Sequence, residues 1–198
     1  MRLRNHFFLG LLAVVPTAYA DKGDIDVGVG YGFASFEFKE PEFTSDAESL
    51  DYVMASGSWS VTHIDKIRLT WRQLDASVGG GSDAEPNTNG LTVEGDQIVI
   101  DWQHNFRLSR YFKPWIGAGI VFNQYRSFDK FSTDSEGYAI AFYEDRDEQS
   151  FSVALSAALE YELFTDFSVA PQIGYDLALG DGPSGLNAGV FLSYRISF

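Results

Sequence analysis

The chain has 198 residues, of which 28 are acidic and 14 basic, so its formal net charge is −14. This length suits one domain, and this charge argues against nucleic acid as a partner, because phosphate binding requires a basic surface. The absence of cysteine excludes disulfides, thiolate metal sites and cysteine nucleophiles. Three histidines leave little for a zinc or two-metal site. We therefore expect no metal and no cofactor.

The N-terminus has the pattern of a secretory leader. Two arginines within the first four residues precede an apolar core over 7–15, and Ala18-Tyr19-Ala20 is a small-x-small cleavage signal. Cleavage after this signal leaves 12 basic and 28 acidic residues, a net charge of −16. We expect a signal peptide over 1–20 and one folded domain over 21–198.

Along the mature chain, apolar and polar residues alternate in eight segments, as in strands with one apolar face. We expect these strands near residues 25–34, 53–61, 67–72, 97–107, 116–123, 151–163, 167–179 and 189–198. The alternation is clearest over 151–163, where apolar residues take every odd position and Ser, Ala and Glu take the even ones. Pro171 falls inside the seventh strand and cannot donate a backbone hydrogen bond, so we expect a bulge or a local break there.

The connections between these strands alternate between long and short. The long ones are expected over 39–51, 76–96, 126–149 and 180–187, and the short ones over 63–66, 109–112 and 164–166. An even number of strands with this alternation is typical of a barrel whose long loops face outside and whose short turns face the periplasm. The sequence therefore predicts an all-β fold, an eight-stranded antiparallel up-and-down transmembrane β-barrel.

Alternation alone does not say which face points inward. A soluble, lipocalin-like barrel would enclose the apolar face, but the interior of eight strands is only just wide enough for side chains to fill. One face carries Phe, Tyr, Trp, Leu, Ile and Val, whereas the other carries mostly Gly, Ser, Ala and a few charges. An arginine facing lipid near the midplane would cost ~2–4 kcal/mol. We therefore expect the apolar face to contact lipid and the small and charged residues to line the lumen.

Two segments resemble motifs of a known family. The last five residues, from Tyr194 to Phe198, resemble the aromatic terminal-strand signal of bacterial outer-membrane barrels, with Ser193 where that family often has glycine. Residues 113–119 (KPWIGAG) resemble the Pro-aromatic-x-Gly-Ala-Gly strand of OmpA-like and related small eight-stranded barrels. The resemblance implies a monomer in the cell outer membrane, in contact with lipid and lipopolysaccharide. It also implies that the barrel-assembly machinery reads Tyr194, Ile196 and Phe198.

Aromatic residues near strand ends are expected in girdles at the membrane interfaces. These are Trp59, Trp71, Trp102, Trp115, Tyr161 and Phe198.

Charged residues on the small-residue face would be enclosed in the lumen and must pair there. These candidate residues are Asp26, Arg68, Arg72, Asp101, Arg107, Glu160, Glu162, Asp176 and Arg195. Strand order predicts three contacts: Arg72 with Asp101, Asp26 with Arg195, and Arg68 and Arg107 with Glu160 and Glu162. We interpret the set as a plug of ion pairs. A narrow passive channel, as the broad porin-family label suggests, is the alternative, and a path through the wall for apolar solutes, as in OmpW-like barrels, is a third possibility.

Enzyme chemistry is not expected. Some eight-stranded outer-membrane barrels act on lipid A with a His/Ser/Glu set facing the outer leaflet. Here His104 is expected near the periplasmic end of its strand and His63 in a periplasmic turn, and neither has a serine nucleophile beside it in the sequence. Interfacial anchoring is the role we expect for His104.

The four expected outer loops hold most of the excess charge, with 17 acidic and 4 basic residues. Such loops are usually a solvated acidic surface. Clustered carboxylates are also ligands for Ca²⁺ or Mg²⁺, which would bridge to lipopolysaccharide phosphates. The candidate residues for such a cation site are Glu144, Asp145, Asp147 and Glu148. The third loop also holds Phe128, Phe131, Tyr138, Phe142 and Tyr143, which either extend the strands or contact an unidentified partner. We therefore predict a surface or envelope-structural protein whose specificity lies in its loops.

Overall fold

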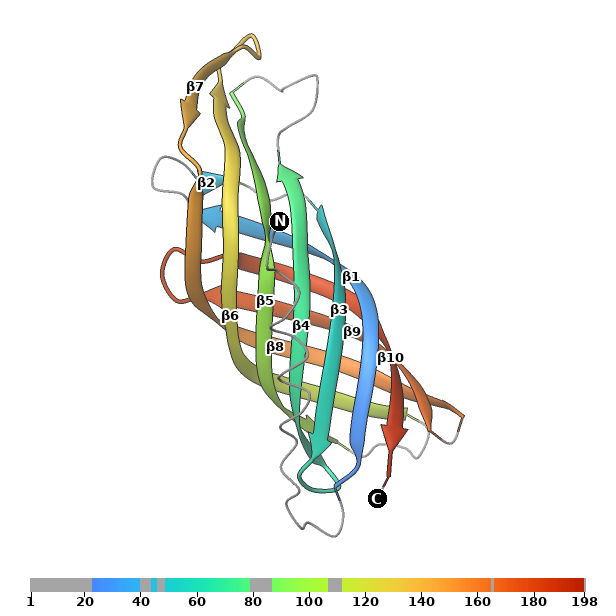
Figure 1. Ribbon diagram of the computed structural model, residues 1–198. Coiled ribbons are helices and arrows are strands. Elements are labelled where there is room, and N and C mark those ends of the chain that lie inside the picture. The colour runs from blue at the N-terminus through green and yellow to red at the C-terminus, as the bar shows by residue number, and fades with distance from the viewer. Residues whose placement is uncertain are drawn as a thin grey trace, which may run out of the picture.

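The computed structural model describes residues 23–39, 44–45, 49–78, 87–106, 112–164 and 166–197, and they form one closed antiparallel barrel (Figure 1). Its eight wall strands are β1 (Ile25–Lys39), β3 (Ser49–Ser60), β4 (Asp65–Val78), β5 (Asn89–Asn105), β6 (Phe112–Thr133), β8 (Arg146–Phe164), β9 (Phe167–Ala178) and β10 (Ser184–Ile196). Each wall strand pairs with its neighbour along the chain, and β10 closes the barrel on β1. Two short strands add to this wall: β2 (Thr44–Ser45) pairs with β1, and β7 (Ala139–Tyr143) pairs with β6. The predicted eight-stranded up-and-down barrel is confirmed.

The signal peptide expected over 1–20 lies outside the described residues and stays a prediction. None of the described residues forms a helix long and apolar enough to cross a membrane.

The outer face of the wall carries large apolar side chains. Val29, Phe33, Ile120 and Leu155 are each more than half exposed, and similar side chains surround the whole barrel. The inner face carries buried Ser, Gln, Asn and charged residues, such as Gln97. The predicted orientation is therefore confirmed: the apolar face points outward, and polar residues line the lumen where these side chains lie.

Glycines on the inner face of β1 leave room for large side chains from the neighbouring strand. A Cβ atom at Gly32 would lie 2.6 Å from the ring of Tyr52, and one at Gly30 would lie 2.8 Å from Met54 Cε. Both distances are shorter than van der Waals contact, so these positions need glycine because the lumen is already filled.

The lumen is not polar along its whole length. At the end next to the long connections, eleven apolar side chains form a buried cluster, which we call the apolar layer. Its members are Ala34, Phe36, Phe38, Leu50, Tyr52, Met54, Leu74, Leu91, Val93, Tyr125 and Phe191. The sequence pattern did not predict this layer, because Phe36, Phe38, Leu74 and Val93 lie where strands continue beyond their expected ends.

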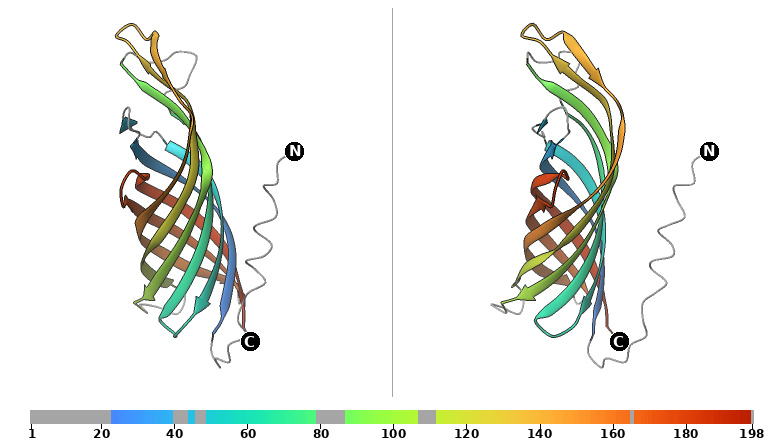
Figure 2. Two further views of the ribbon diagram at one scale, coloured as in Figure 1. Left: turned by 60° about the vertical axis from the view of Figure 1, so that its left-hand side comes forward. Right: turned by 90° about the vertical axis from the view of Figure 1, so that its left-hand side faces the viewer.

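The wall strands extend further outward than predicted. β5 begins at Asn89 and β6 ends at Thr133, so much of the connections expected over 76–96 and 126–149 is strand. β6 and β7 are joined by a turn in which Asp134 Oδ1 accepts hydrogen bonds from the N–H groups of Glu136 and Tyr138, both at 2.9 Å. The third connection is therefore a β-hairpin that projects beyond the barrel mouth (Figure 2), and its assignment as a loop was wrong.

The ladder between β8 and β9 is interrupted beside Pro171. Pairing stops at Ala158↔Gln172 and resumes at Tyr161↔Val169 in the same register. Since proline lacks an N–H group, it cannot donate a hydrogen bond to this ladder. The local break that the sequence predicts here is confirmed, and the register of this ladder shifts only further on, between Glu162 and Phe164.

Candidate functional site

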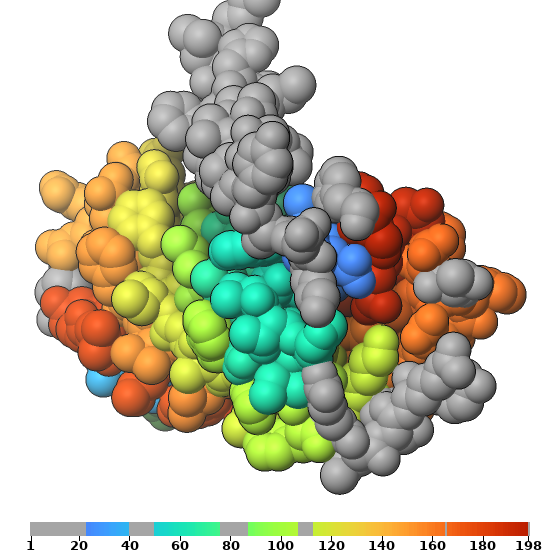
Figure 3. Space-filling view, turned by 90° about the horizontal axis from the view of Figure 1, so that it is seen from below, coloured from blue at the N-terminus to red at the C-terminus, as the bar shows by residue number. Residues whose placement is uncertain are grey.

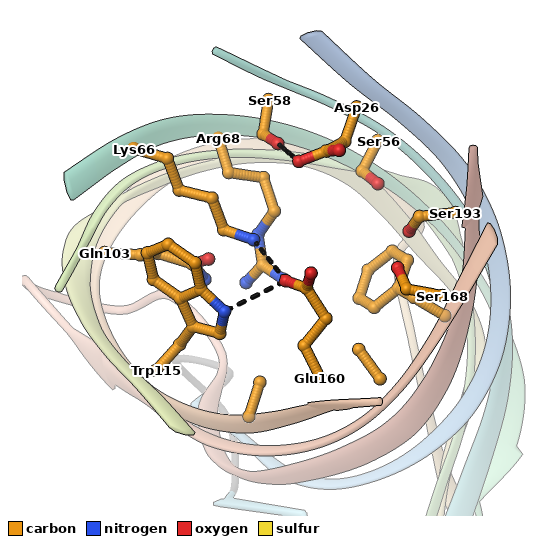
Figure 4. A pocket seen from close by; sticks show the side chains of 13 residues that line it. Asp26, Ser56, Ser58, Lys66, Arg68, Gln103, Trp115, Glu160, Ser168 and Ser193 are labelled. Atoms are coloured by element: carbon orange, nitrogen blue, oxygen red, sulfur yellow. Dashed lines mark hydrogen bonds and ion pairs between the residues drawn. The ribbon is translucent and has the colours of Figure 1, made fainter. Parts of the chain in front are cut away.

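The lumen end next to the short turns holds a network centred on Glu160 of β8 (Figure 4). Glu160 Oε2 lies 3.2 Å from Lys66 Nζ and accepts a hydrogen bond from Trp115 Nε1 at 2.9 Å. Glu160 Oε1 lies 3.2 Å from Arg195 Nη2 and 3.8 Å from Lys113 Nζ. The Glu160 side chain is only 6% exposed. One buried carboxylate thus faces cations from β4, β6 and β10.

A second carboxylate joins this network at the seam of the barrel. Asp26 of β1 pairs directly with Arg195 of β10, and Arg195 Nε donates to Asp26 Oδ1 at 3.1 Å. Ser58 Oγ donates to Asp26 Oδ2 at 3.2 Å. The contact expected between Asp26 and Arg195 is present, and it joins the first strand to the last.

The expected contact between Arg72 and Asp101 is wrong. Arg68, four residues earlier, pairs with Asp101 in the β4–β5 ladder, and its Nε and Nη2 donate to the two carboxylate oxygens at 3.2 and 3.1 Å. Arg72 stands opposite Gln97 and reaches across the lumen to Asp176 of β9, with Nη1 2.7 Å from Oδ2. The register is set by the long upper parts of β4 and β5, which the sequence pattern assigned to a loop.

The expected contact of Arg68 with Glu160 and Glu162 is also wrong, since two lysines take that place. Lys66 and Lys113 contact Glu160, and Lys113 Nζ also lies 3.5 Å from Glu162 Oε2. Sequence reasoning missed both lysines because it placed Lys66 in a turn and Lys113 ahead of the strand expected from residue 116. The alternation of strand residues could have identified Lys66, since Lys66 lies two residues before Arg68 and therefore shares its face of the strand.

Trp115 was expected in an interfacial girdle and instead lies in the lumen. Its indole N–H donates to Glu160, and Lys66 Nζ lies 4.1 Å from the centre of its ring. An indole offers both a hydrogen-bond donor and a cation-binding face, so it suits this charged interior.

The terminal segment follows the expected alternation on the lipid side. Tyr194 pairs with Val27 across the seam, and its ring centre lies 5.1 Å from that of Phe167. Ile196 pairs with Ile25. Phe198 and Arg107 lie outside the described residues, so the assembly signal and the lumen role of Arg107 stay predictions.

A small cavity lies between the Glu160 network and the opposite wall. It measures about 20 Å³ and is lined by Asp26, Arg68, Gln103, Glu160 and Ser168, among others (Figure 4). Such a space holds on the order of one water molecule. Seen from below, the β3–β4 hairpin lies in the middle of this end of the molecule (Figure 3). The Arg72–Asp176 pair and the apolar layer fill further parts of the lumen, and Phe191 of that layer also lines the cavity.

The rim beside the short turns holds the histidine singled out from the sequence. His104 Nδ1 lies 2.9 Å from Asp65 Oδ1, which also accepts a hydrogen bond from Trp102 Nε1 at 3.3 Å. The His104 ring contacts Phe106 edge-on, with centres 5.3 Å apart. This arrangement of aromatic rings around one carboxylate suits the interfacial anchor expected at His104.

The candidate cation residues lie between β7 and the start of β8: Glu144, Asp145, Asp147 and Glu148. Asp145 Oδ2 lies 2.7 Å from Arg126 Nη2, and this hydrogen-bonded carboxylate raises the pKa of Arg126 above its ordinary value. Glu148 accepts a hydrogen bond from the Tyr125 hydroxyl at 3.0 Å. Across the described ranges, no three Asp, Glu, His or Cys side chains are grouped so that they could hold a metal ion. A cation role for these residues stays a prediction.

Comparison with known proteins finds likeness in structure only. No protein-family model and no curated protein matches the sequence. The structure of Ail, the attachment invasion locus protein of Yersinia pestis, is similar at 11% identity and a TM-score of 0.57, covering 88% of this chain and 99% of that one. OprG from Pseudomonas aeruginosa is similar at 13% identity and a TM-score of 0.56, covering 89% and 97%. A major outer-membrane protein from Thermus thermophilus is similar at 13% identity and a TM-score of 0.56, covering 88% and 99%.

The fold and its apolar outer wall define a class, the small eight-stranded outer-membrane β-barrels. The resemblance drawn from the sequence is confirmed at the level of the fold. Because the wall presents large apolar side chains to its surroundings, its solvent is lipid, and a barrel of this class lies in the cell outer membrane.

Proposed function

We propose that this protein is a non-enzymatic outer-membrane barrel with a structural or surface-interaction role, exerted through the acidic part that projects outside. Its lumen serves as a plug and not as a path. The observation that carries this proposal is the filling of the lumen by three groups of side chains: the Glu160 network, the Arg72–Asp176 pair and the apolar layer.

The projecting hairpin supports the interaction role. It extends the sheet beyond the lipid-facing part of the wall and presents exposed Tyr138, Ile140 and Phe142. Rigid elements of this kind hold contact residues in place at low entropic cost. Among similar folds, Ail is an attachment invasion locus protein and NspA is a neisserial surface protein.

The partners in this proposal follow from the wall and the chain end. Lipid covers the apolar wall, and lipopolysaccharide surrounds the outer rim, with divalent cations at residues 144–148 as bridges. The barrel-assembly machinery recognises Tyr194, Ile196 and Phe198, and the folded protein is a monomer. A structure of Ail contains the heparin analogue sucrose octasulfate. A polyanion of that kind suits this chain poorly, because its outer connections hold 17 acidic and 4 basic residues.

Planar-bilayer recording tests the plug directly. The purified full-length protein, shown to be folded by heat-modifiable migration on a gel, is expected to give no steady conductance. A large-lumen porin reconstituted in the same bilayers is the positive control. A steady, reproducible conductance step from this protein would overturn the plug and favour the narrow porin-like channel.

A further inference from the structure

The projecting hairpin ends in an open sheet edge. β7 pairs with β6 from Lys130↔Tyr143 to Thr133↔Ala139, whereas β9 first meets β8 at Ser152↔Ala178. Within the described ranges, no strand pairs with the other side of β7. An unpaired edge presents backbone donors and acceptors to which another extended chain can add as a strand.

One face of β7 is apolar and exposed. Tyr138, Ile140 and Phe142 alternate along the chain and are 68%, 66% and 78% exposed. Phe142 pairs with Phe131, which lies nine residues beyond Phe122. After Phe122, the outward face of β6 continues with the exposed polar residues Gln124 and Arg126. Nine residues of strand span roughly 30 Å, so the hydrocarbon of the membrane cannot cover this face. Three adjacent large apolar side chains at such exposure mark a contact surface.

The hairpin is held rigidly. Its turn is closed by two hydrogen bonds to Asp134 Oδ1, and Gly137 takes the left-handed conformation there, with φ of 85°. Ser132 Oγ donates to Asn89 Oδ1 at 2.7 Å, which ties β6 to β5, and Arg126 pairs with Asp145 at the base of the hairpin. The edge is therefore organised before any partner arrives, which reduces the entropic cost of binding.

The charges beside this edge indicate which kind of partner it binds. Residues 134–148 hold six acidic residues and one basic residue, and Glu136 and Glu144 are exposed on either side of the apolar row. A second copy of this chain would bring two acidic hairpins together, and a polyanion would be repelled. A basic extended segment matches the charge, the open backbone and the alternating apolar side chains.

We propose that the β7 edge binds a basic, extended segment of another protein by strand addition. Tyr138, Ile140 and Phe142 contact its apolar side chains, and Glu136 and Glu144 face its lysine or arginine side chains. This inference rests on the proposed surface-interaction role and names the surface and the partner class.

A fluorescent octapeptide of alternating lysine and valine, titrated into the full-length protein in lipid nanodiscs, tests the inference. We expect saturable binding that weakens with salt. A lysine–glycine octapeptide of equal charge should bind at least tenfold more weakly, and so should a glutamate–valine octapeptide. The variant I140S/F142S should lose at least tenfold in affinity for the lysine–valine peptide, whereas Leu186→Ser, exposed at the outer end of β10 away from β7, should lose none.

Several outcomes would overturn the inference. Equal binding of the lysine–glycine peptide would show charge attraction without strand addition, and equal binding of the glutamate–valine peptide would remove the basic partner. Self-association of the protein that I140S/F142S abolishes would make a second copy the occupant. Failure of peptide binding leaves the plugged lumen intact, because bilayer conductance measures that feature separately.

Discussion

Glu160 is the central residue of the ion-pair network at the lumen end next to the short turns, because three cations share its carboxylate. Replacing Glu160 with Gln keeps its size but leaves Lys66, Lys113 and Arg195 short of one negative charge. Removing one partner of a buried ion pair costs ~3–5 kcal/mol. We expect a loss of that order in the free energy of unfolding, measured by urea titration in lipid vesicles. Glu162→Gln is the matched control.

That control should lose less than about 1 kcal/mol, because the Glu162 side chain is 30% exposed and its contact with Lys113 is 3.5 Å long. If the two variants lost equal stability, the central position of Glu160 in the network would be refuted.

The Arg72–Asp176 pair allows a sharper test, because both side chains are at most 3% exposed. Arg72 Nε and Asp176 Oδ1 have no hydrogen-bond partner within the described part of the chain, so the pair is incompletely satisfied. Either single variant, Arg72→Met or Asp176→Leu, should lose ~3–5 kcal/mol, since each leaves a buried charge alone. The double variant should recover most of that loss in the same urea titration. A double variant as unstable as the sum of the singles would show that the two residues act independently.

For single residues, the sequence identified most of the charged residues of the lumen but fewer of their ion-pair partners. Asp26 and Arg195 could be paired because they flank the seam at the two ends of the chain, where the register has little freedom. Arg72 could not be assigned to Asp176, because that contact crosses the lumen and no ladder predicts which opposite strand a long side chain reaches.

At the scale of the strand, β1 places two phenylalanines in opposite surroundings. Phe38 is fully buried in the apolar layer, whereas Phe33 is 55% exposed on the lipid side. Phe38→Ala should cost ~3–5 kcal/mol, because it leaves a cavity among packed side chains. Phe33→Ala should cost clearly less, since lipid can fill the space. Urea midpoints of the two variants in vesicles compare them, and an equal loss would mean that the apolar layer is loosely packed.

The strand ends were the least predictable feature of these elements. Alternation located all eight wall strands, but the segments above the membrane mix glycine, acidic residues and aromatics, a composition that favours a loop. Pairing between neighbouring strands overrides that preference, as at Gly95, where a Cβ atom would lie 2.4 Å from Gln124 O. The apolar layer became visible only once those outer segments were known to be strands.

At the scale of the whole molecule, the position of the barrel in the membrane makes a depth-dependent prediction. Leu155 and Leu163 both lie on the lipid side of β8 and are similarly exposed, at 55% and 52%. Leu155 falls near the middle of the apolar wall, which on β8 runs from Phe151 to Leu163, and Leu163 falls at its periplasmic end. An arginine at the bilayer midplane costs ~2–4 kcal/mol, and one near the interface costs ~0–1 kcal/mol.

We therefore expect Leu155→Arg to lose several times more unfolding free energy than Leu163→Arg, measured by guanidinium titration in lipid vesicles. The same pair in detergent micelles should differ less, because a micelle deforms around a charge more readily than a bilayer does. Since both substitutions add the same charge on the same strand, the difference reports depth alone. Equal losses in vesicles would mean that the apolar wall does not mark the hydrocarbon core, and the orientation of the barrel in the membrane would have to be reassigned.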